Sequence, residues 1–485
     1  MNIAMLASEA LPLSKTGGLA DVVYALSKEL AKDPKNEVII FTPNYRNAKI
    51  NAFPRLKDLG EIAVDLSWRH LHAHLWEAKL GRLRYILIGN SYYFDRPSLY
   101  GYHDDCERFA FFGNACLAAL RFLKFAPDIL HVHDWQVGMV PCLLKEKDEY
   151  KNDPLFAHTK TVLTIHNPAF KGFIDRYFLA DFWGLPDSLY DNGQVRFDNM
   201  VSTLKAGIVY ADKITTVSPT HRNELLSPYS DQHLNGVLEL RKDDFQGILN
   251  GIDEDEWNPA HDKCLAKTYT ARSWKEGKKA NQKQLLSTFS LTKGKGPIYA
   301  MVSRLSWQKG VDLLLEAAPQ FVGPNVEGTI LILGSGEYAL ERRVQALRDA
   351  YPSRVGVYLG YQNALSHLIY AGADFFLMPS LFEPCGISQM IAQRYGTLPI
   401  VHYTGGLRDT VEGYDGDPTQ YADGIGFRDY DLGGLTYGMS KANELYHQPE
   451  EYARIVGNAL RKDNSWKKSA AAYLRLYHEA LGKEE

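Results

Sequence analysis

The chain reads IAMLA from Ile3 to Ala7 and KTGGLADV from Lys15 to Val22. This order predicts a short buried strand, a glycine-rich loop and the start of a helix that continues to Leu30. Two adjacent glycines, Gly17 and Gly18, allow bare backbone amides to approach a ligand at the amino end of that helix, where the helix dipole favours an anion. The stretch therefore predicts an α/β unit with an anion site after its first strand.

Two charged side chains flank the glycines of this loop. Lys15 adds a mobile positive charge, and Asp21 falls in the first helical turns, where a carboxylate can cap the helix or accept hydrogen bonds from hydroxyls. The loop thus offers contacts for both a phosphate and a sugar. Its spacing matches neither a Walker loop nor the dinucleotide GxGxxG, so a plain tight turn with a solvated Asp21 remains the alternative.

Short continuous apolar runs alternate with helical patterns along the whole chain. In the first half they are Glu37 to Thr42, Arg84 to Ile88, Asp128 to Val132, Lys160 to Ile165 and Lys213 to Val217; after Asn250 they are Ile298 to Val302, Thr329 to Leu333, Val355 to Leu359, Asp374 to Met378 and Leu398 to Val401. Continuous runs are typical of parallel strands that are covered on both faces. The sequence predicts an α/β fold with two doubly wound, Rossmann-like domains facing across a cleft.

The boundary between the domains is expected just before Gly247. Residues 246–251, QGILNG, read as a strand and turn outside the first sheet. We therefore assign residues 1–245 to an N-terminal domain, 246–462 to a C-terminal domain, and 463–485 to a tail helix that returns to the N-terminal domain. The apolar residues of that tail, from Ser465 to Leu481, follow helical spacing.

The bulk composition excludes several classes of protein. The chain has 485 residues, a hydrophobic content of 45% and a net charge of −4, which argues against general nucleic-acid binding. It shows no signal peptide and no apolar run long enough to span a bilayer. Its 5 cysteines are scattered and lack metal-ligand spacing, so a reducing cytoplasm is the expected location.

Most of the unusual polar residues fall where a predicted strand ends or in the loop after it. They are Lys15, Asp134, His166, Asn167, Arg304, Glu383 and the run Thr404-Gly405-Gly406. In open α/β sheets the ligand crevice lies outside the carboxyl ends of the strands. Two such edges, one from each domain, would form one interdomain cleft.

The second domain carries two cations in the run SRLSWQKG, from Ser303 to Gly310. Arg304 and Lys309 can neutralise the charge that grows on a leaving diphosphate, where another enzyme would use magnesium. The alternative is an ordinary pair of surface cations.

The run EPCG of the same domain combines a carboxylate with a predicted helix start. Glu383 can accept hydrogen bonds from sugar hydroxyls, and Pro384 suits a helix start ahead of the helix predicted from Ile387 to Tyr395. The amides near Cys385 and Gly386 can hold a phosphate. Cys385 is either an alkylation-sensitive thiol or, more simply, a small buried hydrophobe.

Two more features of the second domain suit a nucleotide sugar. The run Thr404-Gly405-Gly406 repeats the Gly-Gly helix start of the first domain, so a phosphate or sugar could rest there. Tyr361 follows Gly360 at a predicted strand end and could stack on a nucleobase, although a lone aromatic side chain is more often part of the packing.

Two groups of histidines resemble metal sites. Histidines alternate along one strand face from His70 to His74, but nothing nearby supplies further ligands, so no metal is predicted. A second group contains His131, His133 and Asp134. Here we favour Asp134 as a polar residue of the cleft.

Together these strings resemble one family, the bacterial glycogen synthases and plant starch synthases of glycosyltransferase family 5. Further matching strings are DRPSLYG (Asp95 to Gly101), HDWQ (His133 to Gln136), TIHN (Thr164 to Asn167), LKAGIVYADKITTVSPT (Leu204 to Thr220), ILNGID (Ile248 to Asp253), AGADFFLMPS (Ala371 to Ser380) and YGTLPIVHYTGGLRDTV (Tyr395 to Val411). The likeness covers nearly the whole chain.

The resemblance implies a hexosyltransferase that moves glucose, with retention, from ADP-glucose to the non-reducing 4-hydroxyl of an α-1,4-glucan such as glycogen. The N-terminal domain would serve the acceptor side, and the C-terminal domain would bind the nucleotide sugar. Neither a cofactor nor a metal is implied.

The resemblance also implies roles for individual residues. The catalytic group would be Asp21, His166, Arg304, Lys309 and Glu383, with the two cations on the leaving diphosphate, His166 beside the reacting sugar and Glu383 on the glucosyl group. The nucleotide-sugar group would be Lys15, Gly17, Gly18, Asn167, Asn250, Tyr361, Cys385, Gly386, Thr404, Gly405 and Gly406, with Tyr361 on the adenine. The acceptor group would be Glu9, Asp134 and Trp135.

Three positions depart from the family pattern. Leu381, Leu368 and His402 stand where the family commonly has Arg. They leave Glu383 intact, but the use of UDP-glucose stays open. A catalytically idle glucan-binding subunit is the other alternative, and the intact diphosphate cations argue against it. A second Glu common in family 4 is replaced by Ile391, which favours family 5.

Overall fold

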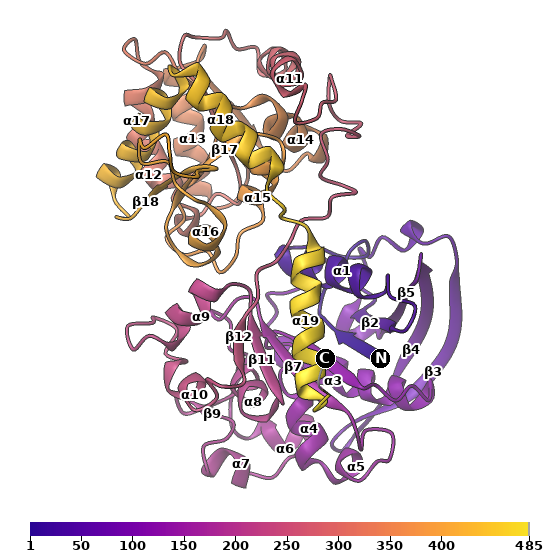
Figure 1. Cartoon of the computed structure of the whole chain (residues 1–485). Helices are drawn as coiled ribbons and strands as arrows, with labels where there is room; N and C mark the ends of the chain where they lie inside the picture. Colours follow the sequence, from indigo (N-terminus) through magenta and orange to yellow (C-terminus); the bar gives the residue numbers. More distant parts are fainter. Residues whose placement is uncertain (484–485) are drawn as a thin grey trace. The chain divides into compact units, whose positions relative to one another are not determined.

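The computed structural model describes residues 1–483, which fall into two compact units (Figure 1). The first unit combines Met1–Asn250 with Trp466–Glu485, and the second comprises Gly251–Ser465. The expected boundaries at residues 245 and 462 lie a few residues before these divisions. Within residues 1–483, none of the helices has both the length and the apolar character that a membrane span requires.

The first unit is built on a nine-stranded sheet in the order β12-β11-β7-β6-β1-β2-β5-β4-β3. These strands are β1 (Asn2–Leu6), β2 (Glu37–Pro43), β3 (Leu56–Leu66), β4 (Arg69–Leu80), β5 (Leu83–Gly89), β6 (Ile129–His133), β7 (Lys160–Ile165), β11 (Lys213–Thr216) and β12 (Phe245–Gly247). The seven strands from β12 to β5 run parallel, and β4 and β3 continue the sheet as an antiparallel hairpin. β1 pairs with both β2 and β6, so successive strands are added on one side of β1 first and on its other side later. Such a topological switch point favours a ligand site.

Alternate residues of each central strand enter different cores. In β1, Ala4 and Leu6 join the apolar cluster on one face of the sheet, whereas Ile3 and Met5 join the cluster on the other face. All four side chains are fully buried. This arrangement requires an apolar residue at every position, which explains the continuous apolar runs that predicted parallel strands.

Helices cover both faces of this sheet. They are α1 (Gly18–Leu30), α2 (Ser91–Phe94), α3 (Asp105–Phe122), α4 (Val140–Glu146), α5 (Asp148–Lys151), α6 (Phe178–Trp183), α7 (Ser188–Asp191), α8 (Thr203–Tyr210), α9 (Pro219–Leu226), α10 (Asn235–Glu239) and α19 (Trp466–Ala480), together with the 3-10 turn Ile50–Ala52. A small second sheet holds β8 (Phe173–Ile174), β10 (Met200–Ser202) and β9 (Arg196–Phe197). The last helix, α19, packs beside α1, and its Tyr473 and Tyr477 are fully buried in the same core as Ile3 (Figure 1).

The second unit has a six-stranded, fully parallel sheet in the order β15-β14-β13-β16-β17-β18. Its strands are β13 (Ile298–Val302), β14 (Thr329–Gly334), β15 (Val355–Leu359), β16 (Phe375–Met378), β17 (Leu398–His402) and β18 (Ile425–Phe427). Its helices are α11 (Trp274–Thr288), α12 (Val311–Val322), α13 (Tyr338–Ala350), α14 (Asn363–Gly372), α15 (Ser388–Arg394), α16 (Gly405–Thr410), α17 (Leu432–Tyr446) and α18 (Pro449–Arg461), with a 3-10 turn at Trp307–Lys309. Here β13 lies between β14 and β16, so this sheet also has a switch point.

The structure confirms the predicted fold class of two doubly wound parallel α/β sheets and corrects one strand. The prediction that residues 246–251 lie outside the first sheet is wrong, because Phe245–Gly247 forms β12 and pairs in parallel with β11. A Cβ at Gly247 would lie 2.3 Å from the carbonyl oxygen of Ser218, so this glycine lets the edge strand approach the neighbouring loop closely.

Candidate active site

The loop between β1 and α1 contains one ion pair and one carboxyl group that accepts two hydrogen bonds. The Lys15 Nζ lies 2.7 Å from Asp21 Oδ1, with the lysine side chain 46% exposed. Glu9 Oε2 accepts hydrogen bonds from the Thr16 backbone N–H at 2.5 Å and from the Thr16 hydroxyl at 3.0 Å. Gly17 is the residue before the first helical turn, so Asp21 does not act as the N-cap that the sequence allowed.

Burial makes this loop chemically unusual. It raises the pKa of Glu9 to about 7, and the nearby negative charge of Asp21 adds to the increase, whereas the hydrogen bonds from Thr16 oppose it. Burial also raises the pKa of Asp21, and the Lys15 ammonium opposes that shift. Two carboxyls and one ammonium group therefore lie at the carboxyl end of β1: Lys15 pairs with Asp21, whereas Glu9 is held by hydrogen bonds from Thr16.

Gly17 is not required by packing within the protein. A Cβ there would meet no atom closer than Glu9 Oε1, at 3.9 Å, and both Gly17 and Gly18 are exposed. The fold itself therefore leaves room for a side chain at Gly17. A ligand resting on this backbone is the simplest physical reason for a glycine there.

Asp134 joins the ends of β6 and β7. Its Oδ1 accepts hydrogen bonds from the backbone N–H groups of His166 at 2.6 Å and Asn167 at 3.3 Å, and its own N–H donates to the Thr164 carbonyl at 2.9 Å. The backbone of Asp134 is left-handed, with φ 61°, a conformation that Asp and Asn tolerate better than most residues. Burial raises the pKa of this carboxyl to about 7, against the effect of the two N–H donors.

His166 and Asn167 occupy the loop after β7 and are both half-buried. The ring Nε2 of His166 lies 3.0 Å from Nδ1 of His133, and burial lowers the pKa of His166 to about 3, so the ring is neutral at physiological pH. The side-chain carbonyl of Asn167 accepts from the Ala169 N–H at 3.1 Å and so shapes its own loop. At the end of the first unit, the buried Asn250 Oδ1 has no hydrogen-bond partner within residues 1–483.

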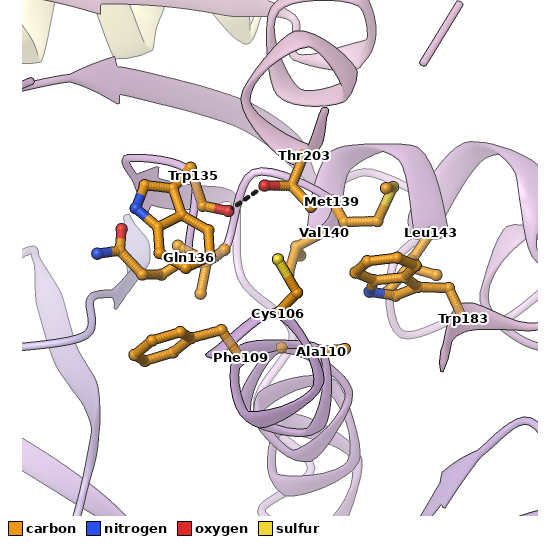
Figure 2. Close-up of a pocket in the computed structure, with 12 residues that line it drawn as sticks. Cys106, Phe109, Ala110, Trp135, Gln136, Met139, Val140, Leu143, Trp183 and Thr203 are labelled. Carbon is orange, nitrogen blue, oxygen red and sulfur yellow. Dashed lines mark hydrogen bonds between the residues drawn. The ribbon is translucent and has the colours of Figure 1, made fainter. Parts of the chain in front are cut away.

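Trp135 lines a small cavity and is fixed by a hydrogen bond and an aromatic contact. Figure 2 shows its carbonyl accepting a hydrogen bond from the Thr203 hydroxyl, at 2.6 Å, while its ring meets Phe109 edge-on with centroids 5.4 Å apart. The cavity below, lined also by Cys106 and Trp183, has a volume of about 10 Å³. That is room for about one water molecule, so the cavity is too small for a sugar or a nucleotide.

In the second unit, Lys309 and Glu383 form a direct ion pair. The Lys309 Nζ lies 2.5 Å from Glu383 Oε2, and the two side chains are only 18% and 10% exposed. The hydroxyl of Ser380 donates to the same carboxylate oxygen at 3.3 Å. Lys309 follows β13 and Glu383 follows β16, so adjacent parallel strands bring together the predicted cation and the predicted sugar-binding carboxylate.

The backbone of Glu383 is fixed by the glycine run after β17. The Gly406 N–H donates to the carbonyls of Glu383 and Pro384, both at 3.1 Å. A Cβ at Gly405, where φ is 44°, would lie 2.0 Å from the Glu383 carbonyl oxygen, and one at Gly406 would lie 2.3 Å from the Cys385 carbonyl oxygen. Glycine is therefore required at both positions so that two loops can touch backbone to backbone.

Arg304 lies at the end of β13 and is exposed. Within residues 1–483 its guanidinium makes no hydrogen bond or ion pair with another residue. Tyr361, after β15, is 66% exposed, and its hydroxyl donates to Asn363 Oδ1 at 2.8 Å. Both side chains are thus available to a ligand.

Three details of the second unit bear on the predictions. The helix predicted from Ile387 to Tyr395 is observed as Ser388–Arg394, and Gly386, with φ 72°, separates it from Pro384. Cys385 is 4% exposed, which fits the small buried hydrophobe. His402, at a family Arg position, places Nδ1 2.7 Å from the Ser380 carbonyl and Nε2 3.1 Å from the Arg428 carbonyl.

The structure also brings together residues that the sequence did not single out. Among residues 1–483, possible ligand atoms of Asp262, Cys264 and His367 lie within 4.8 Å of one another. Asp262 Oδ2 already accepts from His367 Nδ1 at 2.7 Å and from the Tyr395 hydroxyl at 2.5 Å, so the group is satisfied as a hydrogen-bond network. In the His70 to His74 run, His70 and His74 pair with carboxylates of Asp65 and Asp58 across the β3–β4 hairpin.

The raised pKa of Asp134 predicts a pH dependence of stability. The carboxyl binds its proton more tightly in the folded protein, where its pKa rises from 3.8 to about 7. Its stabilising contribution is therefore complete below pH 3.8 and is lost as the pH rises towards 7. Asp134→Asn cannot ionise, keeps an acceptor for the His166 N–H and tolerates the left-handed backbone.

We expect the variant to gain on the order of 2 kcal/mol in free energy of unfolding, relative to the unsubstituted protein, between pH 4 and 7. Denaturant unfolding at a series of pH values measures this difference. Asp231→Asn, at an exposed position, is the control and should give a curve parallel to that of the unsubstituted protein. Parallel curves for Asp134→Asn as well would contradict the prediction.

Comparison with known proteins places this geometry in a family. Residues 2–240 match the family model for the starch synthase catalytic domain, and residues 282–425 match that for glycosyl transferases group 1. A glycogen synthase from Geobacillus thermodenitrificans is 40% identical over 486 residues, covering 100% of this chain and 99% of the relative. One from Clostridium beijerinckii is 41% identical over 487 residues and 100% of both chains.

Solved structures agree with these matches. The catalytic domain of starch synthase IV from Arabidopsis thaliana, solved with ADP and acarbose bound, superposes with a TM-score of 0.92 at 31% identity, covering 99% of each chain. A sucrose-phosphate synthase from Thermosynechococcus elongatus, with a TM-score of 0.61 and 18% identity over 99% of each chain, shares the fold. The chain belongs to the glycogen synthase and starch synthase family of glycosyltransferases.

Proposed function

We propose that the protein transfers a glucosyl group from ADP-glucose to the non-reducing 4-hydroxyl of an α-1,4-glucan, with retention and release of ADP. The observation that carries this proposal is the Lys309–Glu383 pair at the strand ends of the second unit, together with the Arg304 guanidinium, which is unpaired within residues 1–483 and lies on the same strand end as Lys309. Related glycogen synthases over the full length of the chain, and a similar starch synthase that binds ADP and acarbose, support this choice of donor and acceptor.

The ion pair suggests how the donor is recognised. Without a nucleotide sugar, Lys309 and Glu383 neutralise each other in a largely buried setting. A diphosphate offers Lys309 a doubly charged partner, and Glu383 is then released to accept hydrogen bonds from glucosyl hydroxyls. Arg304 supplies the second cation, and together the two stabilise the charge on the departing ADP without proton transfer.

The first unit repeats this arrangement. Lys15 pairs with Asp21 as Lys309 pairs with Glu383, so a phosphate that attracts Lys15 leaves Asp21 to bind hydroxyls. Asp134 holds the backbone of His166 in place, and Trp135 presents a fixed aromatic ring on which an acceptor sugar can stack. In this proposal Glu9, Asp134 and Trp135 serve the glucan.

The direct test is to incubate the purified protein with ADP-glucose and glycogen, with and without a chelator, and to measure ADP release and glucan growth. We expect both products in equal amounts and no effect of the chelator, because protein cations stabilise the leaving group. A parallel assay with UDP-glucose measures the base preference. Absence of nucleoside diphosphate release from either donor, with correctly folded protein, would overturn the proposal.

Replacing Lys309 tests its part in leaving-group stabilisation. Lys309→Ala should lower kcat on the order of a hundredfold, about 3 kcal/mol of transition-state stabilisation. Glycogen binding should persist. Lys441→Ala is a matched control, since Lys441 forms an exposed pair with Glu444 on α17. An unchanged kcat for Lys309→Ala would remove Lys309 from the mechanism.

The glycines of the two units should respond differently to alanine. Gly405→Ala places a Cβ 2.0 Å from the Glu383 carbonyl oxygen and should lower both the melting temperature and kcat. Gly17→Ala meets nothing closer than 3.9 Å, so it should leave the melting temperature unchanged. Its effect should be a rise in the KM for ADP-glucose of roughly tenfold, because the ligand loses its close approach to the backbone.

Gly236→Ala is the control for both glycine variants, because a Cβ there meets nothing within 4 Å in helix α10. Scanning calorimetry and steady-state kinetics measure the three variants side by side. A lowered melting temperature for Gly17→Ala, or an unchanged KM, would show that this glycine is not reserved for a ligand.

A further inference from the structure

Three histidines of the first unit form a buried row. His131 and His133 lie two positions apart on β6 and so point to the same side of the sheet, and His166 directly follows the neighbouring strand β7. The rings of His131 and His133 are stacked with centroids 4.2 Å apart, and those of His133 and His166 are 5.2 Å apart. The Nδ1 of His133 lies 3.0 Å from Nε2 of His166. The proposed function uses only the last member of this row.

The contact between His133 and His166 joins two ring nitrogens, so one of them carries the hydrogen and the other accepts it. Burial lowers the pKa of both residues, that of His166 to about 3, and both rings are neutral at physiological pH. A neutral imidazole carries one N–H, which leaves two arrangements. Either His133 donates from Nδ1, or His166 donates from Nε2.

The second nitrogen of His133 decides between these arrangements. Its Nε2 is buried and has no hydrogen-bond partner within residues 1–483. If His166 were the donor, His133 would have to carry its own hydrogen on Nε2, as a buried N–H without an acceptor. Orphaned buried donors are costly and rare, and an unsatisfied acceptor is better tolerated. The hydrogen therefore lies on Nδ1 of His133.

We propose that His133 is a positioning residue that holds His166 in the tautomer with its hydrogen on Nδ1. This inference rests on the proposed function only because that function supplies the substrate that His166 contacts. The Nε2 of His166 is occupied as an acceptor from His133. His166 consequently presents an N–H donor from its remaining nitrogen, suited to a hydroxyl or ring oxygen of a sugar, and it does not act as a general base through Nε2.

The rest of the row fixes the ring of His133. His131 is held at both nitrogens, by the Tyr477 hydroxyl at 2.8 Å from Nδ1 and by the Thr164 hydroxyl at 2.6 Å from Nε2. Thr164 in turn contacts the Thr215 hydroxyl at 2.6 Å. With its plane set in this way, His131 forms a rigid stacking surface for His133. Helix α19 carries Tyr477 and thus helps to fix the ring of His131.

Two substitutions separate the hydrogen bond from the packing. His133→Asn places an amide N–H near the position of Nδ1–H, whereas His133→Phe keeps an aromatic ring for stacking and removes the donor. We expect His133→Phe to lower kcat on the order of tenfold to a hundredfold, the effect of losing one buried hydrogen bond. The KM for ADP-glucose should stay within a factor of about two. His133→Asn should recover most of kcat.

The tautomer itself is measured by nitrogen NMR of the full chain labelled with ¹⁵N-histidine, with His166→Gln used to assign the His166 signals. We expect a hydrogen on Nδ1 of His166 in the unsubstituted protein and in His133→Asn, and a mixture of tautomers in His133→Phe. A hydrogen on Nε2 of His166 in the unsubstituted protein would overturn the inference, and so would equal losses of kcat in both variants with an unchanged tautomer.

The NMR measurement needs no turnover, so it decides the inference even if a variant fails to fold. It also separates the two proposals. A protein that shows the expected tautomer but releases no nucleoside diphosphate would refute the function and leave the role of His133 standing.

Discussion

The position of Glu383 depends on a contact between two stretches of backbone. The loop after β17 touches the loop after β16 so closely that its Gly405 and Gly406 have no room for a Cβ. Through this contact the carboxylate of Glu383 is held beside Lys309, at the end of the adjacent strand. The position of Glu383 is therefore set by main-chain packing, which is more rigid than an array of long side chains.

Each unit keeps a lysine paired with a carboxylate at a strand end. The pairs Lys15–Asp21 and Lys309–Glu383 avoid the cost of leaving isolated charges in partly buried positions. A ligand that carries phosphate at one end and hydroxyls at the other suits both members of such a pair. A phosphate alone satisfies the lysine but leaves the carboxylate without its partner. This asymmetry favours a sugar nucleotide over a free nucleotide.

Much of the fold could be predicted from the sequence because parallel strands buried on both faces require apolar residues at every position. The runs at Lys160–Ile165, Ile298–Val302 and Val355–Leu359 have the predicted limits. The three-residue edge strand β12 was assigned outside the sheet, since so short a run carries little apolar signal. The helix predicted from Ile387 to Tyr395 is observed as Ser388–Arg394, and the left-handed backbone of Gly386 keeps Pro384 outside it.

The site was predicted less completely than the fold. Strand-end position made Asp134, His166 and Glu383 candidates, because the polar residue after an apolar run is visible in sequence. The direct partner of each side chain was not visible, since it depends on which strands are neighbours in the sheet. The contact of His133 with His166 joins residues on β6 and the end of β7 that are 33 positions apart, and only the sheet order reveals it.

The place of helix α19 has a consequence for biosynthesis. The core of the first unit contains Trp466, Tyr473 and Tyr477, although the whole second unit separates them from Asn250 in the chain. A nascent chain that has just released residue 250 from the ribosome still lacks the segment that covers part of its apolar surface. All residues of the second unit are synthesised before this segment, so the first unit completes its core only after the second unit has been made. Until then, the exposed apolar face beside α1 is a surface on which chaperones can act.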